Sequence, residues 1–389
     1  MFLLIGLGLL LYIIYRLYQH IFNITNINPH NKYVLISGCD TGIGHALAIE
    51  LDKQGFNVLA GVYLSNNIIS LKAKLSSKAT IFHLDITKEE DINITFELVQ
   101  KKTNTLHARI NNAGIITHGY IDWTSLELMR QVMNVNFFGH VAMTKKFLPL
   151  LIAKRQSRLV NICSATGFFT FPNICAYSAS KYALESFSDC LRREMTPWNL
   201  QVSIIEPGAI RTSMNENYAD ILQNLWNQLS TDIQQRWGMD FLNNLINQGI
   251  NSPFIKYADD PNKVVQAVQH AIMNINPHIR YRPGWQAKLF FIVLYLPPTC
   301  SKVYKATKFC NKITITFSSI QQRSSKDSSR ITRLLSIIMV FQFTSYSSFA
   351  APTSSCPNCV FSQPSMISQP STIFSPFSYP QAFYYPRLY

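Results

Sequence analysis

The amino-acid sequence predicts an α/β fold in which one parallel sheet carries helices on both faces. Two observations lead to this class. Short runs rich in β-branched residues, such as 33–37 and 57–63, alternate along the chain with segments of helical periodicity. The first run also ends in a glycine-rich turn that opens a helix. Strands that alternate with helices form βαβ units, and these build a single doubly wound parallel sheet.

Each element can be justified in order along the chain. An apolar run too short for a helix and bounded by turn residues predicts a buried parallel strand. Gly55 closes the first helix, as glycine commonly does. Strands are expected at 33–37, 57–63, 80–87, 108–114, 158–164 and 201–208, and helices at 45–55, 89–101, 123–152, 177–195 and 263–273.

Two later segments depart from this alternation. Residues 213–260 are rich in Asn, Gln, Trp and Leu, which predicts helices inserted as a substrate loop. Residues 284–298 are apolar but too short to span a bilayer with ease, so a core helix and an interfacial helix both stay open.

The two ends of the chain differ from the segment between them. Residues 1–15 hold no charged side chain, and apolar residues continue beyond Arg16 to about residue 22, which is marginal but sufficient to span a bilayer. The basic start and small-residue cleavage site of a signal peptide are missing. We therefore expect an uncleaved membrane anchor at 1–22 and a folded domain at 32–310. Residues 311–389 form a low-complexity tail that is expected to be disordered, and a fusion of two reading frames is one explanation for it.

Composition narrows the function classes. The formal net charge is +14, but no dense Lys and Arg stripe interleaved with aromatic residues indicates nucleic-acid binding. The low charged fraction of 14% and the 12% aromatic content instead indicate contact with membrane lipid. The eight cysteines show no disulfide-framework spacing, and Cys356 and Cys359 form a single C-x-x-C without a second pair. No metal site is predicted.

The segment "SGCDTGIGH" lies between the first strand and the first helix, the context that a dinucleotide site requires. Missing side chains let the backbone approach a pyrophosphate at the helix N-terminus. A tight turn without a ligand is the alternative. The predicted cofactor-binding residues of this loop are Gly38, Asp40, Thr41, Gly42, Ile43 and Gly44.

The end of the second strand indicates which dinucleotide is bound. An acidic residue there would bind the ribose 2′-hydroxyl and an Arg would accept a 2′-phosphate, but "AGVYLSNN" contains neither. Asp40 would repel a phosphate. We therefore predict NAD, with NADP as the alternative. Asp85, after the third strand, is placed to meet the adenine ring or, alternatively, to serve as an acid at a helix N-terminus.

Tyr177 and Lys181 stand four residues apart on one predicted helix, so they share a face. A nearby ammonium favours the phenolate and is expected to lower the Tyr pKa, which makes the pair a candidate acid/base. Ser164 ends a strand at the edge where ligands bind. Its hydroxyl can hold a substrate oxygen beside the phenol, and the Asn136 amide can anchor a water near Lys181.

The chain contains "SGCDTGIG", "NNAG" at 111–114, Asn136, Ser164, "YSASK" and "EPGAIRT" at 206–212. In this order and spacing they resemble the short-chain dehydrogenase/reductase family, which has a Rossmann-type fold, and the resemblance covers residues 32 to about 310. The chain also contains "GCDTGIG", "VNFFG", "ALESFSDCLRREM", "IIEPGAIRTSM" and "YRPGWQAKLFF". These segments are similar to the branch of retinol dehydrogenases, 17β-hydroxysteroid dehydrogenases and type 1 3-hydroxybutyrate dehydrogenase.

The resemblance implies a role for each matched residue. Tyr177 is the general acid/base, Lys181 lowers its pKa and binds the nicotinamide ribose, Ser164 polarises the substrate oxygen, and Asn136 holds a relay water. The remaining residues are implied to contact the cofactor: Asn112, Ala113 and Gly114 on the adenosine side, and Pro207, Gly208 and Thr212 near the carboxamide.

The sequence therefore predicts a membrane-anchored NAD(P)-dependent oxidoreductase that interconverts an alcohol and a carbonyl on a retinoid or steroid. A catalytically idle scaffold that binds lipid or protein is the alternative from another class, and the intact Asn136, Ser164, Tyr177 and Lys181 argue against it. A dehydrogenase for small hydroxy acids is the third. The endoplasmic reticulum membrane is the expected location, with its orientation open, and a homodimer the expected assembly.

Overall fold

The computed structural model describes residues 6–8, 10–12, 14, 26–215 and 217–294. The predicted tail at 311–389 lies outside these residues, and the predicted anchor at 1–22 is described at only a few positions. Within the described ranges, no helix combines the length and apolarity needed to cross a membrane.

A seven-stranded sheet forms the centre of the domain, in the order β3-β2-β1-β4-β5-β6-β7. Neighbouring strands are parallel throughout, which confirms the predicted doubly wound sheet. The chain order reverses between β1 and β4, the place where such sheets bind ligands. The strands are β1 (Tyr33–Ser37), β2 (Asn57–Val62), β3 (Thr80–His83), β4 (Ala108–Asn111), β5 (Arg158–Ile162), β6 (Gln201–Ile205) and β7 (Arg280–Tyr281).

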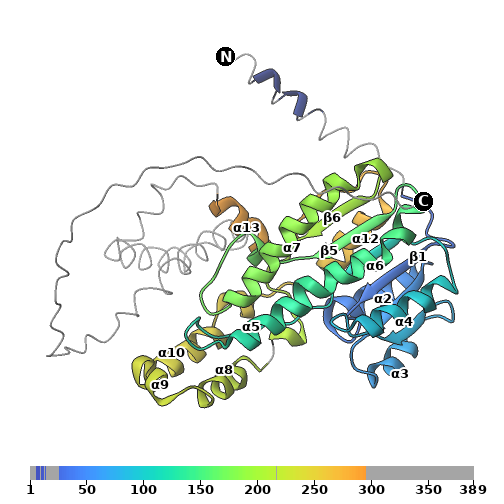
Figure 1. Cartoon of the computed structure of the whole chain (residues 1–389). Coiled ribbons are helices and arrows are strands. Elements are labelled where there is room, and N and C mark those ends of the chain that lie inside the picture. The colour runs from blue at the N-terminus through green and yellow to red at the C-terminus, as the bar shows by residue number, and fades with distance from the viewer. Residues whose placement is uncertain (1–5, 9, 13, 15–25, 216, 295–389) are drawn as a thin grey trace, which may run out of the picture. The chain divides into compact units, whose positions relative to one another are not determined.

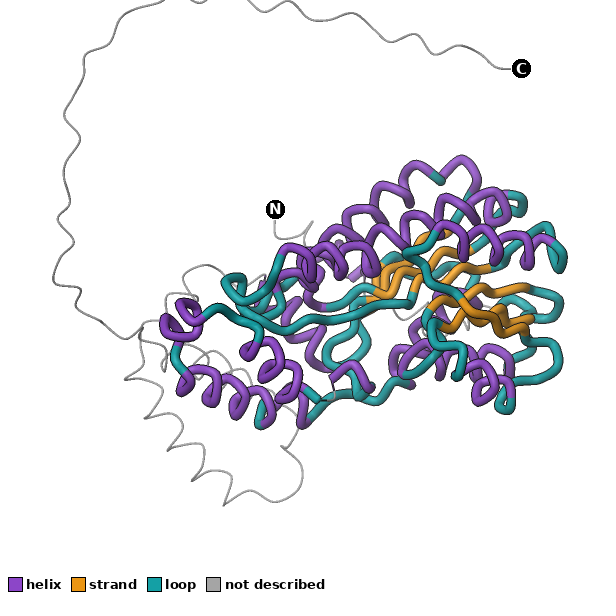
Figure 2. The backbone as a smooth tube through the Cα atoms, turned by 60° about the horizontal axis from the view of Figure 1, so that its bottom comes forward, coloured by secondary structure: helices purple, strands orange, loops and turns teal. Residues whose placement is uncertain are grey.

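Helices cover both faces of the sheet (Figures 1 and 2). The domain contains the helices α2 (Gly42–Lys53), α3 (Asn67–Lys72), α4 (Glu89–Gln100), α5 (Leu126–Met133), α6 (His140–Ile152), α7 (Cys175–Glu194), α8 (Tyr218–Asn227), α9 (Thr231–Trp237), α10 (Met239–Ile250), α11 (Pro253–Lys256), α12 (Asn262–Met273) and α13 (Trp285–Leu294). The short elements α3 and β7 carry too few residues for a periodic signal, and the sequence analysis did not predict them.

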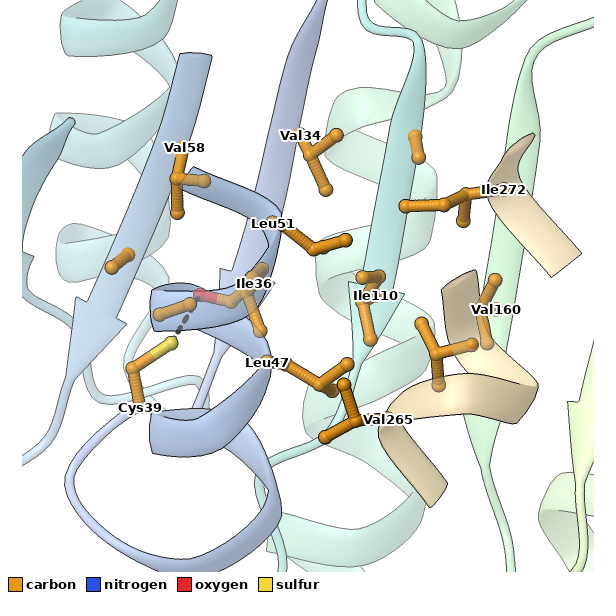
Figure 3. Close-up of a cluster of buried hydrophobic side chains, with 14 of the residues drawn as sticks. Val34, Ile36, Cys39, Leu47, Leu51, Val58, Ile110, Val160, Val265 and Ile272 are labelled. Carbon is orange, nitrogen blue, oxygen red and sulfur yellow. Dashed lines mark hydrogen bonds between the residues drawn. The ribbon is translucent and has the colours of Figure 1, made fainter. Parts of the chain in front are cut away.

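Two apolar layers hold the sheet to its helices. One lies beneath α2 and α12 and includes Leu47, Leu51 and Val265, packed on Ile36 and Ile110 (Figure 3). The other lies beneath α4, α6 and α7. Because both faces of the central strands are buried, these strands read as continuous apolar runs rather than as alternating ones.

The predicted helix at 123–152 is interrupted. A π-helical segment, Asn134–Gly139, separates α5 from α6. The Asn136 side chain bonds both backbone groups of Ile115, accepting from N–H and donating to C=O, each at 2.9 Å. Such π segments occur frequently at functional sites, and here the irregular turn brings a polar side chain onto the neighbouring chain.

The segment predicted to hold inserted helices forms a lobe of α8, α9 and α10. Its centre is aromatic, with Trp123 packed edge-to-face against Trp226 and Trp237. The apolar segment after residue 284 forms α13, whose Ala287 and Phe290 are buried against Ala165. For the described residues, the core-helix alternative is therefore the correct one.

Candidate active site

The glycine loop connects β1 to α2 and has the backbone that the sequence analysis expected. Gly38 and Gly42 have positive φ angles of 73° and 59°, which glycine adopts without steric cost. A Cβ on Gly44 would lie 2.1 Å from the Gly38 carbonyl oxygen, so no side chain fits there.

No described side chain caps the N-terminus of α2. Thr41 is its N-cap residue, yet its side chain makes no capping hydrogen bond, and the first turn holds no acidic residue. The orphan N–H groups and the helix dipole together favour an anion at this position. The loop therefore has the backbone that a pyrophosphate site requires, and contact of Gly42, Ile43 and Gly44 with the cofactor stays a prediction.

Asn112 fixes the shape of this loop. Its Nδ2 donates to the carbonyl oxygens of Ser37 at 3.0 Å and Gly38 at 2.9 Å. Asn112 thus joins the end of β4 to the end of β1, and a Cβ on Gly38 would lie only 2.7 Å from the Ala113 Cα. The structure places Asn112 and Ala113 at the loop, and Gly114 lies further on, beside Asn136 and Lys181.

Asp40 has contacts that the sequence analysis did not foresee. Its carboxylate accepts the backbone N–H groups of Tyr63 and Leu64, both at 2.8 Å, and the Asn67 side-chain amide at 3.1 Å. The glycine loop thereby supplies an acidic group to the end of β2, where "AGVYLSNN" has none.

Asp85 lies after β3, and its described contacts are local. Its Oδ1 accepts from the backbone N–H of Thr87 at 2.9 Å and from the Thr87 hydroxyl at 2.7 Å. These bonds form a turn immediately before α4. They match the alternative of an acid near a helix N-terminus, and the adenine contact stays a prediction.

Tyr177 lies in the first turns of α7 and is only 9% exposed. Burial raises the pKa of Tyr177 to about 12, and a hydrogen bond with the Ser164 hydroxyl acts in the opposite direction. Without the cofactor, the phenol is therefore protonated at neutral pH. The expected lowering of this pKa by Lys181 does not dominate, because removing the phenolate from water costs more.

Lys181 is buried one turn beyond Tyr177. Its Nζ donates to the Ile162 carbonyl oxygen at 2.9 Å and lies 5.6 Å from the centre of the Tyr177 ring. Burial lowers the pKa of Lys181. The ammonium thus lies over the ring face while the hydroxyl of Tyr177 meets Ser164, so the predicted catalytic side chains do converge.

Asn136 lies beside Gly114, as Lys181 does. Its Nδ2 also donates to the Ser180 hydroxyl on α7 at 3.0 Å, which links the π segment to the helix that carries Tyr177 and Lys181. His140, four residues later, was missed by the sequence analysis. Its Nε2 donates to the Ala113 carbonyl oxygen at 2.8 Å, and burial keeps the pKa of this imidazole well below its usual value.

The loop after β6 closes the far side of the site. Ala165 N–H donates to the Pro207 carbonyl oxygen at 2.8 Å, so this loop is held beside the strand end that carries Ser164. A Cβ on Gly208 would lie 2.7 Å from the Gln286 side chain. Thr212 approaches the glycine loop, since a Cβ on Gly42 would lie 3.1 Å from its methyl group.

Comparisons with known proteins agree with this geometry. A sequence profile described as short chain dehydrogenase matches residues 32–222. The 17-beta-hydroxysteroid dehydrogenase type 6 of Bos taurus is 35% identical over 286 residues, which cover 72% of this chain and 88% of the relative. Retinol dehydrogenase 7 of Mus musculus is 35% identical over 275 residues, 69% of this chain and 85% of the relative.

A solved structure agrees in fold alone. A short-chain dehydrogenase from Streptomyces avermitilis superposes with a TM-score of 0.57 at 22% identity and covers 76% of this chain and 98% of its own. The two sequence relatives support an assignment beyond the fold, because this chain aligns with 88% and 85% of their length at 35% identity. The chain belongs to the short-chain dehydrogenase family and is an NAD(P)-dependent oxidoreductase that acts on alcohols.

Proposed function

We propose that the enzyme interconverts a lipophilic secondary or primary alcohol, a retinoid or a steroid, and its carbonyl. The observation that carries this proposal is the buried contact of Tyr177 with Ser164 beside Lys181. Two hydroxyl groups that meet at one point can both bond a single substrate oxygen, which is the geometry that acid/base work on an alcohol needs.

Each side chain has a proposed role at the substrate oxygen. NAD(P), when bound, supplies the acceptor or donor of hydride. Tyr177 transfers the proton at the substrate oxygen, and Ser164 donates a hydrogen bond to that oxygen. Lys181 binds the ribose and supplies positive charge near the phenol, while Asn136 holds a water that passes the proton onward.

The direction of the reaction determines which protonation state of the Tyr177 phenol is required. With a pKa of about 12, the phenol is ready to donate a proton to a carbonyl. In the oxidation direction it must first lose its proton, and positive charge near the hydroxyl favours that loss. Lys181 supplies such charge from within the protein, which supports its proposed dual role.

The preference for NAD over NADP is part of the proposal. Asp40 holds a carboxylate at the end of β2, bonded to the backbone of Tyr63 and Leu64. A 2′-phosphate at the adenosine ribose would approach this carboxylate and be repelled, whereas a 2′-hydroxyl could bond to it.

The lipophilic substrate class is supported by aromatic surroundings and by the relatives' names. Phe168, Phe169 and Phe171 follow Ser164 closely and pack with Ala165 and Phe290. The relatives are called a 17-beta-hydroxysteroid dehydrogenase and a retinol dehydrogenase. Membrane attachment through residues 1–22 and a homodimer remain part of the proposal, and a carbonate wash of membranes carrying a variant deleted for 1–22 tests the first.

The test of the proposed function is a turnover panel. The full chain in detergent is assayed with NAD and with NADP against all-trans-retinol, a 17β-hydroxysteroid and 3-hydroxybutyrate, with absorbance at the reduced nicotinamide band. We expect turnover of the retinoid or the steroid with NAD. Turnover of 3-hydroxybutyrate alone would contradict the substrate class, and no turnover of any alcohol would contradict the activity.

A further inference from the structure

A cluster of charged side chains lies behind the catalytic helix, outside the site described above. Arg280 on β7 is at its centre. Its Nε lies 3.0 Å from Glu206 Oε1, and its Nη2 lies 3.1 Å from Glu185 Oε2 and 2.6 Å from Asp189 Oδ2. One guanidinium therefore binds three carboxylates from two different elements, the end of β6 and α7.

The carboxylates of this cluster are costly to bury. Glu206 is 1% exposed, and its second oxygen lies 2.7 Å from Arg282 Nε. Burial and the charge of Glu185 raise the pKa of Glu206 to about 7. Burial also raises the pKa of Glu185. Buried carboxylates that lose their cation are strongly destabilised, so the position of Arg280 on β7 constrains both α7 and the end of β6.

Glu206 connects the cluster to the loop after β6. Its backbone N–H bonds the Tyr281 carbonyl oxygen at 2.8 Å. The next residue, Pro207, accepts the N–H of Ala165, the residue after Ser164. A shift of Glu206 would therefore also move Pro207. Because Pro207 bonds Ala165, this movement would displace the end of β5, where Ser164 lies.

Glu185 connects the cluster to Lys181, one helical turn away. A Cβ added to Gly167 would lie 3.1 Å from Glu185 Cγ, 3.2 Å from the Lys181 carbonyl oxygen and 3.3 Å from Cys163 Sγ. The turn that follows Ser164 therefore packs directly on this part of α7. Cys163 also donates to the Lys181 carbonyl oxygen at 3.2 Å.

We propose that Arg280 is a positioning residue for the dehydrogenase reaction. By binding Glu206, Glu185 and Asp189 together, it holds the ends of β5 and β6 and the helix α7 in one arrangement, so that Ser164, Tyr177 and Lys181 meet at the substrate oxygen. The proposal rests on the proposed catalytic roles of these three residues, and Arg280 would act through its carboxylate partners.

Arginine is needed at this position for its shape. Its planar fork can bond several carboxylates in fixed directions, whereas a lysine is a point charge on a flexible stem. A cavity of about 300 Å³ lined by Glu185, Glu206 and Arg280 adjoins the cluster. It leaves room for water to replace the contacts that a lysine cannot make.

The test compares Arg280→Lys with Arg192→Lys in the full chain. Arg192 is a matched control because it is equally exposed at its side chain and bonds Asp189 at 3.5 Å, with no described contact to Glu185 or Glu206. Hydrogen exchange of the backbone amides is measured for peptides covering 164–169 and 206–212. This measurement needs no substrate, so it stays informative if the proposed substrate class is wrong.

We expect Arg280→Lys to speed exchange in both peptides by at least about tenfold, while peptides of β1 and β4 and the Arg192→Lys protein stay unchanged. With the alcohol that the wild type oxidises, kcat should fall by at least about tenfold, since small misplacements of reacting groups are costly. The cofactor KM should rise as well, because Lys181 and the loop at 206–212 are proposed to contact the cofactor, whereas Arg192→Lys should leave both constants unchanged. Unchanged exchange and kcat in Arg280→Lys would overturn the proposal, as would equal effects in both variants.

A second variant covers the case in which Arg280→Lys unfolds. Glu206→Gln keeps the size of the side chain and one acceptor oxygen but removes its charge. It should speed amide exchange in the same two peptides and lower kcat, again with a raised cofactor KM. If the Gln variant folds and shows wild-type exchange in 206–212, the proposal is wrong.

Discussion

The cofactor half of the domain and the helical lobe are built on different principles. From β1 to β4, backbone atoms approach each other so closely that the residue type is dictated, as at Gly38 and Gly44. In the lobe of α8–α10, side chains make the contacts, and its centre is a group of Trp and Tyr rings. The first arrangement leaves no room for a side chain at these two positions. The second can be repacked, which suits a region expected to adapt to the substrate.

A matched pair of glycines provides the sharpest test of this comparison. A Cβ on Gly44 would lie 2.1 Å from the Gly38 carbonyl oxygen, and a Cβ on Gly249 would lie 2.1 Å from the Tyr218 ring. The overlap is equal, but the first partner is the backbone of the glycine loop and the second is a side chain of the lobe, whose hydroxyl accepts from Asn173 at 2.9 Å.

We expect Gly44→Ala to reduce affinity for NADH by more than about a hundredfold, because the loop must move away from the pyrophosphate. Gly249→Ala should leave NADH affinity unchanged and alter only the substrate KM. Fluorescence titration with NADH measures both. Equal loss of NADH affinity in the two variants would show that the halves are not independent.

Lys181→Ala should have the next largest effect, and it should impair both cofactor binding and the reaction at the substrate oxygen. One ammonium serves both the ribose and the phenol, so the variant should lose about a hundredfold or more in kcat/KM and bind NADH more weakly. Steady-state kinetics and NADH titration measure these quantities. A variant with wild-type NADH affinity would leave Lys181 only one of its two roles.

The sequence was informative where chemistry requires a residue type at a fixed spacing. The glycines of the loop, Asn112 and the pair Tyr177 and Lys181 were predicted because each occurs in a short local pattern. The strand ends were predicted too long, at 80–87 and 108–114, because polar residues there leave the sheet and form the site instead.

Contacts between residues distant in sequence were not predicted. Asp40 accepts from Tyr63 at the end of the neighbouring strand, His140 bonds Ala113, and Arg280 binds Glu185, 95 positions earlier. No local pattern marks such pairs. The pKa of Tyr177 was also predicted in the wrong direction, because sequence spacing reveals the neighbouring Lys181 but not the extent of burial.

Asp40→Asn should have the smallest effect among these variants. The amide keeps the size of the side chain and can still accept one of the backbone N–H bonds, but it no longer repels a 2′-phosphate. The ratio of kcat/KM for NADP to that for NAD should rise by about tenfold, which corresponds to about 1.4 kcal/mol. Steady-state kinetics with both cofactors measures the ratio, and an unchanged ratio would mean that preference is determined elsewhere.

The most direct test of the proposed mechanism is hydride transfer by Tyr177→Phe. The full-length variant is saturated with NAD and given all-trans-retinol or the 17β-hydroxysteroid carrying deuterium at the carbinol carbon, and deuterium on the nicotinamide is counted by mass spectrometry. We expect NADH affinity within about twofold of wild type and a transfer rate lowered by at least about a hundredfold, because the phenol oxygen alone exchanges the proton. Transfer at a rate close to that of the wild type would contradict Tyr177 as the acid/base.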